Sequence, residues 1–591
     1  MAFLKKAKDI TLQIVFGINP EPVSFESDAS SVDEQDSYGA PVEKVSPLGY
    51  QASSWTIVYL IIQGVIGTGI FVTPASVLKS LGSVGASYVF WIVGFIITLF
   101  QISVYIEYVT YFPKRSGAEV VYLEQAYNRP KFMMPVVYAA TTVILSFATS
   151  SASAFASYIF SAAGHHPTPW QQRGLALAPL FLCFIIVSVN NKIAVRLNNF
   201  LGFVKVVFIV FIAITGLVVL GGHTKVGNTH DIFKDAWKGT TKDGNSISNA
   251  ILKVVFSYSG SGYAFSVVAE TVPKDTIRAY KKYVPLTMFL IFILYILVVT
   301  AYFAGVGSVK EIKHAGSLVS SIFFKKVFGK RAATALDVFV AISAFGHLLG
   351  VFIAHSRSLR ECGRQGVLPF PRLWTSVKPW GTPIFPAFIT LLINIIVLLA
   401  PPPGDAYNFV VDLGSYSSYI FNMLLFVGLF KLRRHRKKLG LGYKEFHIWT
   451  PVLIVAILWT WFVLAMAFVP PKGTLKGSDV TFFYATYPLT TIGLFLICVF
   501  YYLVWAFILP KFGKYVHRIE LFELGTGEQG HTVVKVPLEN LAQYDAENGG
   551  QVVDSLNQPP LYEDITQNDT DSSGNTKPAK KDPVVVVENK F

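Results

Sequence analysis

Two stretches of the sequence carry residue types that could bind a small charged molecule. The first, QGVIGTGIF, extends from Gln63 to Phe71 and places Gly67 and Gly69 on either side of Thr68, inside a segment long enough to span a membrane. Because each glycine lowers helix stability by about 1 kcal/mol, this pattern predicts a broken helix. In lipid, unpaired backbone groups are tolerated only where they line a cavity. Alone, such a pattern serves helix packing equally well.

The second stretch, LKVVFSYSGSGYAFSVVAE, extends from Leu252 to Glu270 and has small polar residues between two apolar halves. Ser259, Gly260 and Gly262 lie in this interruption, which falls in the sixth apolar segment of the chain. Breaks in the first and sixth helices are typical of secondary transporters built from inverted repeats, whose substrate site lies between the two unwound segments.

The two predicted breaks have complementary chemistry. Amides around Thr68, freed beside the N-terminus of a half-helix, favour an anionic group, and carbonyls around Ser257 favour a cationic one. A zwitterion with both charges on one carbon, an α-amino acid, fits this arrangement. The predicted substrate-binding residues are Ile66, Gly67, Thr68, Gly69, Ile70, Phe256, Ser257, Ser259, Gly260 and Tyr263. Tyr263, Phe265 and Phe71 are candidates for an apolar wall or gate.

Lys205 lies within the apolar segment LNNFLGFVKVVFIVF, where a lysine needs a specific reason. Either its ammonium extends to the cytoplasmic end of the span, or it faces the unwound first helix. Burial disfavours the charged form of such a group, so its charge could change during a functional cycle. Weaker candidates are Glu107, which we expect to be a loop-facing anchor, and Asp337, His347 and Asp412, for which we favour structural hydrogen bonding.

The elements that position these residues are membrane helices. The 591 residues are 52% hydrophobic and only 15% charged, whereas soluble domains carry about 25% charged residues. Apolar runs of about 20 residues recur, each long enough to cross a bilayer. The predicted fold is an all-α polytopic membrane protein with about twelve transmembrane helices in a core over residues 55–509. The predicted spans are 55–78, 84–108, 132–162, 174–190, 197–221, 248–272, 283–306, 332–354, 384–401, 407–430, 447–469 and 482–508.

The distribution of basic residues predicts the orientation. The net charge of +14 is concentrated in alternate loops, most densely in KLRRHRKK at 431–438, which argues against nucleic acid and places both termini in the cytoplasm. Residues 1–54 and 510–591 are expected to be cytoplasmic tails, the second largely disordered.

Four motifs resemble the amino acid–polyamine–organocation superfamily, and in particular its L-type amino acid transporters. They are GVIGTGIF, PKRSGAEVVYLEQAY, FSYSGSGYAFSVVAE and RECGRQGVLP, and the resemblance covers roughly residues 50–510. Thr68 replaces a serine of the family pattern, and Ser261 stands where a tryptophan is common. Within the superfamily, the long tails and the VIGTGIF and SYSGSGYAF segments are most similar to the fungal high-affinity methionine permeases.

The resemblance implies a LeuT-type fold of five plus five helices and proton-driven uptake of methionine, with cysteine as a further substrate, at the plasma membrane. Proton-dependent members carry a lysine at the position of Lys205, which implies that it is the proton-linked residue or a structural stand-in for sodium. Animal exchangers of the family are disulfide-linked to a heavy chain through the loop after the third span. Here that loop, Ser161–Arg173, has no cysteine, so no covalent heavy chain is expected. A large neutral amino acid exchanger or uniporter, and an amino acid sensor, are the alternatives.

Other classes of function have little support. No nucleophile–base set or metal-ligand cluster is recognisable among the spans, so neither an enzyme, nor a cofactor, nor a metal site is expected, and the His165–His166 pair is too isolated to indicate a metal. The tail sequence QPPLYEDI contains Pro559, Pro560 and Tyr562 in the pattern that WW domains bind. It predicts a ubiquitin ligase of the WW-containing class as a partner that triggers endocytosis, with Lys5, Lys6 and Lys8 as acceptors.

Overall fold

A computed structural model of the protein describes residues 40–547, with short gaps, together with residues 585–586. The gaps are 44, 68, 146–147, 225, 228, 273–274, 315–318, 400–404, 439–444, 471–474, 477–481 and 526. Several predicted functional residues lie outside the described residues, and their roles stay predictions. They are Thr68, the tail lysines Lys5, Lys6 and Lys8, and the motif residues Pro559, Pro560 and Tyr562.

Helices cover every interval in which a span was predicted. They are α2 (Ser54–Val65), α3 (Gly69–Leu81), α4 (Val84–Tyr111), α6 (Met133–Leu145), α7 (Thr149–Ala163), α8 (Pro169–Val189), α9 (Asn191–Leu220), α11 (Gly244–Tyr258), α12 (Gly262–Phe265), α13 (Thr276–Val306), α16 (Lys330–Arg364), α18 (Ile384–Leu399), α19 (Asp405–Lys438), α20 (Thr450–Met466) and α21 (Thr486–Leu503). α21 continues through a π-helical turn (Val504–Ile508) into α22 (Leu509–Gly513).

Eight of the described helical segments are long and apolar enough to cross a membrane, and the bent pair α2 and α3 makes a ninth. α18 and α20 are apolar but shorter, and α11 and α12 are separated by a break. The chain is therefore a mostly helical polytopic membrane protein. The count of twelve spans and the five-plus-five repeat stay predictions.

Shorter elements connect the long helices. They are α5 (Glu119–Ala126), α10 (Asp231–Lys234), a 3₁₀ turn (Val268–Glu270), α14 (Val309–His314), α15 (Val319–Phe328) and α17 (Pro371–Thr375). Local sequence sets several helix starts. The Ser53 hydroxyl accepts from the Thr56 amide at the start of α2, and Thr168 and Gln171 form a reciprocal capping box at the start of α8.

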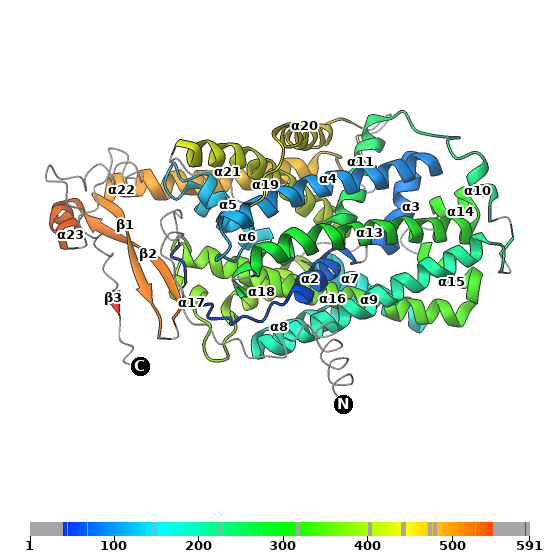
Figure 1. Ribbon diagram of the computed structural model, residues 1–591, viewed down its shortest axis with the longest axis horizontal. Helices are drawn as coiled ribbons and strands as arrows, with labels where there is room; N and C mark the ends of the chain where they lie inside the picture. Colours follow the sequence, from blue (N-terminus) through cyan, green and yellow to red (C-terminus); the bar gives the residue numbers. More distant parts are fainter. Residues whose placement is uncertain are drawn as a thin grey trace.

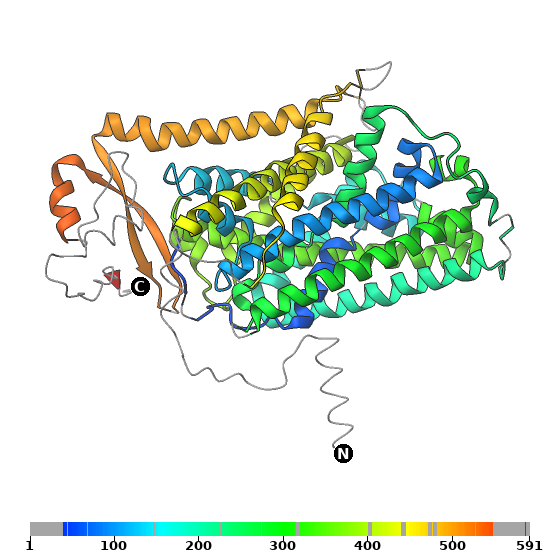
Figure 2. The same ribbon diagram turned by 45° about the horizontal axis from the view of Figure 1, so that its top comes forward.

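The long helices run side by side along the length of the molecule, and α9 packs along α13 in both views (Figures 1 and 2). Apolar side chains on the outer helices face away from the protein, among them Ile185 on α8, Phe211 on α9 and Leu458 on α20, each about half exposed or more. A row of exposed apolar residues of this kind matches the lipid-facing surface of a membrane protein.

The C-terminal region differs from its prediction. Residues 510–591 were expected to be a largely disordered tail, but β1 (Tyr515–Glu523) and β2 (Gln529–Pro537) form an antiparallel hairpin at one end of the bundle (Figure 1). A 3₁₀ turn (Leu538–Asn540) and α23 (Leu541–Glu547) follow, and β3 (Val585–Val586) pairs parallel to β1. The apolar residues of a strand alternate with polar ones, so a search for long apolar runs does not detect such strands.

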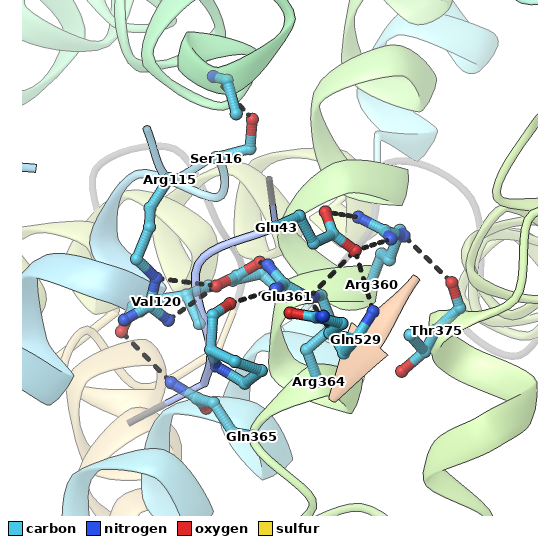
Figure 3. Close-up of polar contacts among 12 residues, drawn as sticks. Glu43, Arg115, Ser116, Val120, Arg360, Glu361, Arg364, Gln365, Thr375 and Gln529 are labelled. Carbon is cyan, nitrogen blue, oxygen red and sulfur yellow. Dashed lines mark hydrogen bonds and ion pairs between the residues drawn. The ribbon is translucent and has the colours of Figure 1, made fainter. Parts of the chain in front are cut away.

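A buried ionic cluster lies where the hairpin meets the end of α16 (Figure 3). Arg115 donates to Glu361 (2.6 Å) and to Glu124 (2.9 Å), and Arg364 donates to Glu361 (2.6 Å). The Arg364 guanidinium also donates to the Gln529 carbonyl of β2 at 2.8 Å. The cluster joins α5, α16 and the hairpin.

Glu43, from the segment before α2, also belongs to this ionic cluster (Figure 3). Its carboxylate accepts from Arg360 at 2.6 Å and from the Gln529 amide at 3.4 Å. Residues from both predicted tails therefore contact each other and the same end of α16, which places these two segments on one side of the helix bundle.

Candidate functional site

The first predicted break is present between α2 and α3, which meet at an angle of 42°. The carbonyls that the break releases accept hydrogen bonds from side chains of other helices. The Lys205 ammonium on α9 donates to the Ile66 carbonyl at 2.7 Å, and the Tyr295 hydroxyl on α13 donates to the Val65 carbonyl at 2.9 Å. These contacts satisfy backbone groups that a continuous helix would pair internally.

The second predicted break lies between α11 and α12. Ser259 ends α11 in an extended conformation, and Gly260 has a φ of +102°, which disfavours any residue with a side chain. The two breaks touch through their backbones. A Cβ built on Gly64 would lie 2.3 Å from the Gly260 carbonyl oxygen, and one on Gly260 would lie 2.4 Å from the Gly64 carbonyl oxygen.

A cavity of about 340 Å³ lies between the breaks, a size within the range of small-molecule sites. Seven of the ten predicted binding residues line it: Gly67, Gly69, Phe256, Ser257, Ser259, Gly260 and Tyr263. Ile66 and Ile70 are not among its lining residues and are buried in the core. The remaining one, Thr68, lies outside the described residues.

Lys205 does not reach this cavity. Its side chain is only 4% exposed, and its ammonium lies behind the first break, 2.7 Å from the Ile66 carbonyl and 3.5 Å from the Gln63 carbonyl. The prediction that it faces the unwound first helix is confirmed, whereas extension toward the end of the span is not observed. While it is protonated, the Lys205 ammonium at this point offsets the partial negative charge of the carbonyls at the end of α2.

Two tyrosines that the sequence patterns did not single out belong to the site. The Tyr295 hydroxyl bridges the breaks, since it donates to the carbonyls of both Val65 (2.9 Å) and Ser257 (3.1 Å). Tyr105 on α4 lines the cavity and donates to Glu119 on α5. The only sequence signal for Tyr295 is a polar hydroxyl within the apolar run IFILYILVV, and tyrosines are common in this chain.

The predicted aromatic gate is only partly correct. Tyr263 lines the cavity, with its ring 6.0 Å from the ring of His347. Phe71 and Phe265 do not line it. Both are buried in the core, Phe71 beside Phe208 and Phe265 beside Tyr105, because each follows its break on the face that packs against neighbouring helices.

The other ionisable residues mostly have structural partners. His347 lines the cavity and shares a hydrogen bond with the Ser151 hydroxyl at 2.9 Å, and Asp337 accepts from Ser161 and Ser321. Both residues therefore have hydrogen-bond partners, and their structural role in place of a proton relay stays a prediction.

Glu107 contacts the loop that precedes α20, as expected of a loop-facing anchor, and its side chain is also fully buried. Arg433 on α19 donates to both of its oxygens at 2.8 and 2.6 Å, and the Ile448 amide donates at 2.9 Å. The KLRRHRKK stretch supplied this partner from far along the chain, so the local sequence around Glu107 gave no sign of the pair.

Comparison with known proteins agrees with this geometry. Residues 53–497 match the family described as amino acid permease. The chain is a member of the amino acid permease family. Its members are permeases rather than enzymes, so amino acid transport is the activity that follows from membership.

Three relatives show which known transporters this permease resembles in sequence. It is 35% identical to the high-affinity methionine permease of Saccharomyces cerevisiae over 472 residues, which is 77% of this chain and 79% of that one. The low-affinity methionine permease of the same yeast is 27% identical over 79% of this chain and 85% of that one. The human cystine/glutamate transporter is 30% identical over 64% of this chain and 72% of that one. The predicted relationship to methionine permeases and L-type transporters is thereby confirmed.

Proposed function

We propose that this permease imports L-methionine, with cysteine as a further substrate, together with protons, by alternating access of the cavity between the two breaks. The observation that carries the proposal is the direct backbone contact of Gly64 and Gly260 beside a 340 Å³ cavity lined by both broken helices. Similarity to two proteins named methionine permeases supports the choice of substrate.

The polarity of the half-helices supports binding of a zwitterion. α3 begins at Gly69 beside the cavity, and the first amides of a helix have no partner within it. The substrate carboxylate is assigned to these amides, where the helix dipole is positive. The substrate ammonium is assigned to the carbonyls around Phe256 and Ser257, at the negative end of α11. Tyr263 and His347 then border the side chain of the substrate.

Lys205 is assigned to coupling, either as the proton-linked group or as a fixed charge in place of sodium. Its ammonium contacts the carbonyl of Ile66 directly behind the first break, so a change in its charge would alter the end of α2. Rocking of the broken helices against the surrounding helices would then expose the cavity to each side in turn.

The first test is uptake of radiolabelled methionine into proteoliposomes, with and without an inward proton gradient. Wild type is compared with Lys205→Ala and with Lys330→Ala, which removes an exposed lysine at the start of α16. We expect accumulation that depends on the gradient in wild type and in Lys330→Ala, and its loss in Lys205→Ala. Wild-type accumulation that does not depend on the proton gradient would refute proton symport. Transport of another amino acid in place of methionine would refute the assignment of methionine as the substrate.

An exchanger is the second candidate, because the human cystine/glutamate transporter is 30% identical over much of the chain. Exchange predicts that uptake requires an amino acid preloaded inside the vesicles, whereas symport does not. The same preparation therefore separates the two functions when it is loaded with buffer alone.

The proposed location is the plasma membrane, with both termini in the cytoplasm. The contact of Glu43 with Gln529 supports placing the two tails on one side. The dense basic segment at 431–438 supports calling that side cytoplasmic, because its Arg433 pairs with Glu107 near the end of α4, shortly before Arg115 of the ionic cluster.

A further inference from the structure

The cavity between the breaks contains a carboxylate to which the sequence patterns gave no role. Glu119 is the first residue of α5, the short helix between α4 and α6 (Figure 1). Its half-buried side chain lines the cavity. Among the described residues that line the cavity, it is the single Asp or Glu, and none of them is Lys or Arg.

The Glu119 carboxylate reaches the second break, and the described residues offer it no cationic partner there. The Tyr105 hydroxyl donates to its Oε1 atom at 2.5 Å, and a Cβ built on Gly262 at the start of α12 would lie 3.5 Å from the same atom. Within the part of the chain that the structure describes, no ion pair involves Glu119. Arg115, four residues earlier, is committed to two other carboxylates.

A carboxylate without a cationic partner is easier to protonate when it is buried than when it is exposed to water. Burial raises the pKa of Glu119, while the hydrogen bond from Tyr105 opposes the rise. Water that enters the cavity can deliver the proton or remove it, because the side chain faces the cavity and not the packed core. Lys205, in contrast, lies behind the first break and does not line this cavity.

We propose that Glu119 is the group that binds the co-transported proton, and that Lys205 serves as a fixed charge at the first break. The proposal rests on the proton coupling put forward above and names its carrier. While the cavity is open to the outside, the Glu119 carboxylate takes one proton from water. When the cavity opens to the cytoplasm, the carboxyl group returns that proton to water, so one proton enters with each zwitterion.

Other titratable groups surround Glu119 and could in principle replace it. They are Tyr105 on α4, Tyr122 on α5, Tyr138 on α6, Tyr263 on α12, and His347 and His355 on α16. The tyrosines are neutral at physiological pH, because an unperturbed phenol has a pKa of about 10. The histidines are therefore the rival carriers that the test must separate from Glu119.

The test is methionine accumulation in proteoliposomes under an inward gradient of one pH unit, with the membrane potential clamped at zero. Coupling to one proton allows about tenfold accumulation in wild type. Glu119→Gln replaces the carboxylate with a neutral side chain of the same shape. In this variant the methionine concentration inside should only equal that outside. Exchange of methionine at equal pH on both sides should be retained. Glu445→Gln, at an exposed carboxylate paired with Lys281, is the matched control and should behave as wild type.

A second variant keeps the test decisive if Glu119→Gln does not assemble. Tyr105→Phe removes one of the donors that stabilise the ionised carboxylate, the other side-chain donor being Tyr138, so the midpoint of uptake against pH should move to higher pH. Tenfold accumulation in Glu119→Gln or an unmoved midpoint in Tyr105→Phe would overturn the proposal. So would loss of coupling in His347→Gln or His355→Gln without its loss in Glu119→Gln. Absence of gradient-driven accumulation in wild type would instead refute the proton coupling itself.

Discussion

Replacing Gly64 by alanine tests the central feature of the site, the backbone contact between the two breaks. A Cβ at position 64 would lie 2.3 Å from the Gly260 carbonyl oxygen and 2.7 Å from the Cδ2 atom of the Tyr263 ring. Ordinary van der Waals contact begins at 3.4 Å. The two segments must therefore separate by 1.1 Å, the difference between 3.4 and 2.3 Å.

The expected cost follows from this overlap. The nearest atom belongs to the backbone and cannot rotate away, so overpacking of about 1–3 kcal/mol applies. If that cost falls on the substrate-bound arrangement, the dissociation constant of the amino acid rises by about 5- to 150-fold. Gly174→Ala is the matched control, because a Cβ there has nothing within 4 Å and alanine favours the α8 helix that contains it.

The assay is equilibrium binding of radiolabelled methionine to purified permease, together with thermal unfolding in detergent. Gly64→Ala should weaken binding within the stated range, while Gly174→Ala should bind as wild type with an equal or slightly higher unfolding temperature. A Gly64→Ala protein with wild-type affinity and unfolding temperature would show that the two breaks do not touch as described, and would refute the reasoning.

Two further predictions concern parts of the molecule outside the cavity. Arg433→Met should lower the free energy of unfolding by about 3 kcal/mol, because it leaves the fully buried Glu107 carboxylate without its cationic partner. Thermal unfolding should show that the Arg433→Met/Glu107→Gln double variant regains much of this stability. A double variant that regains none would contradict the pairing. Burial and the nearby Arg115, Arg364 and Lys131 charges lower the pKa of His531 in the hairpin to about 3. Because the unfolded hairpin binds this proton below about pH 6.5 while the docked one does not, the docked state loses stability as the pH falls below that value. Limited proteolysis of the hairpin should accelerate in this range and do so less in His531→Gln, and equal acceleration in the two proteins would disprove the assignment.

The sequence by itself determined the class of protein and the position of its site. Long apolar runs require membrane helices, and glycine and serine within such runs weaken the helix at fixed positions. Both effects are local, so the breaks at Gly67 and Gly260 and the family motifs were readable without a structure. For Lys205 the sequence required a polar environment but left two placements open, and the structure shows the one against the first break.

The tertiary structure decided which side chains serve these breaks. Tyr295 and Glu119 come from helices far from Gly64 and Gly260 in sequence, and nothing local distinguishes either from its many equivalents in the chain. Their roles depend on which face of α13 or α5 packs against the broken helices. The pairing of Glu107 with Arg433, across more than 300 residues, is decided in the same way.

The difference between local sequence and tertiary packing also explains the predictions that were wrong. Phe71 and Phe265 adjoin the breaks in sequence but face the core, since successive residues of a helix point about 100° apart and only some reach the cavity. The C-terminal hairpin was missed because its strands contain no long apolar run. Its docking depends on the Glu43 and Gln529 contacts at the end of α16. Sequence thus fixes where the backbone of this permease breaks, whereas packing between distant segments selects the side chains that surround the substrate.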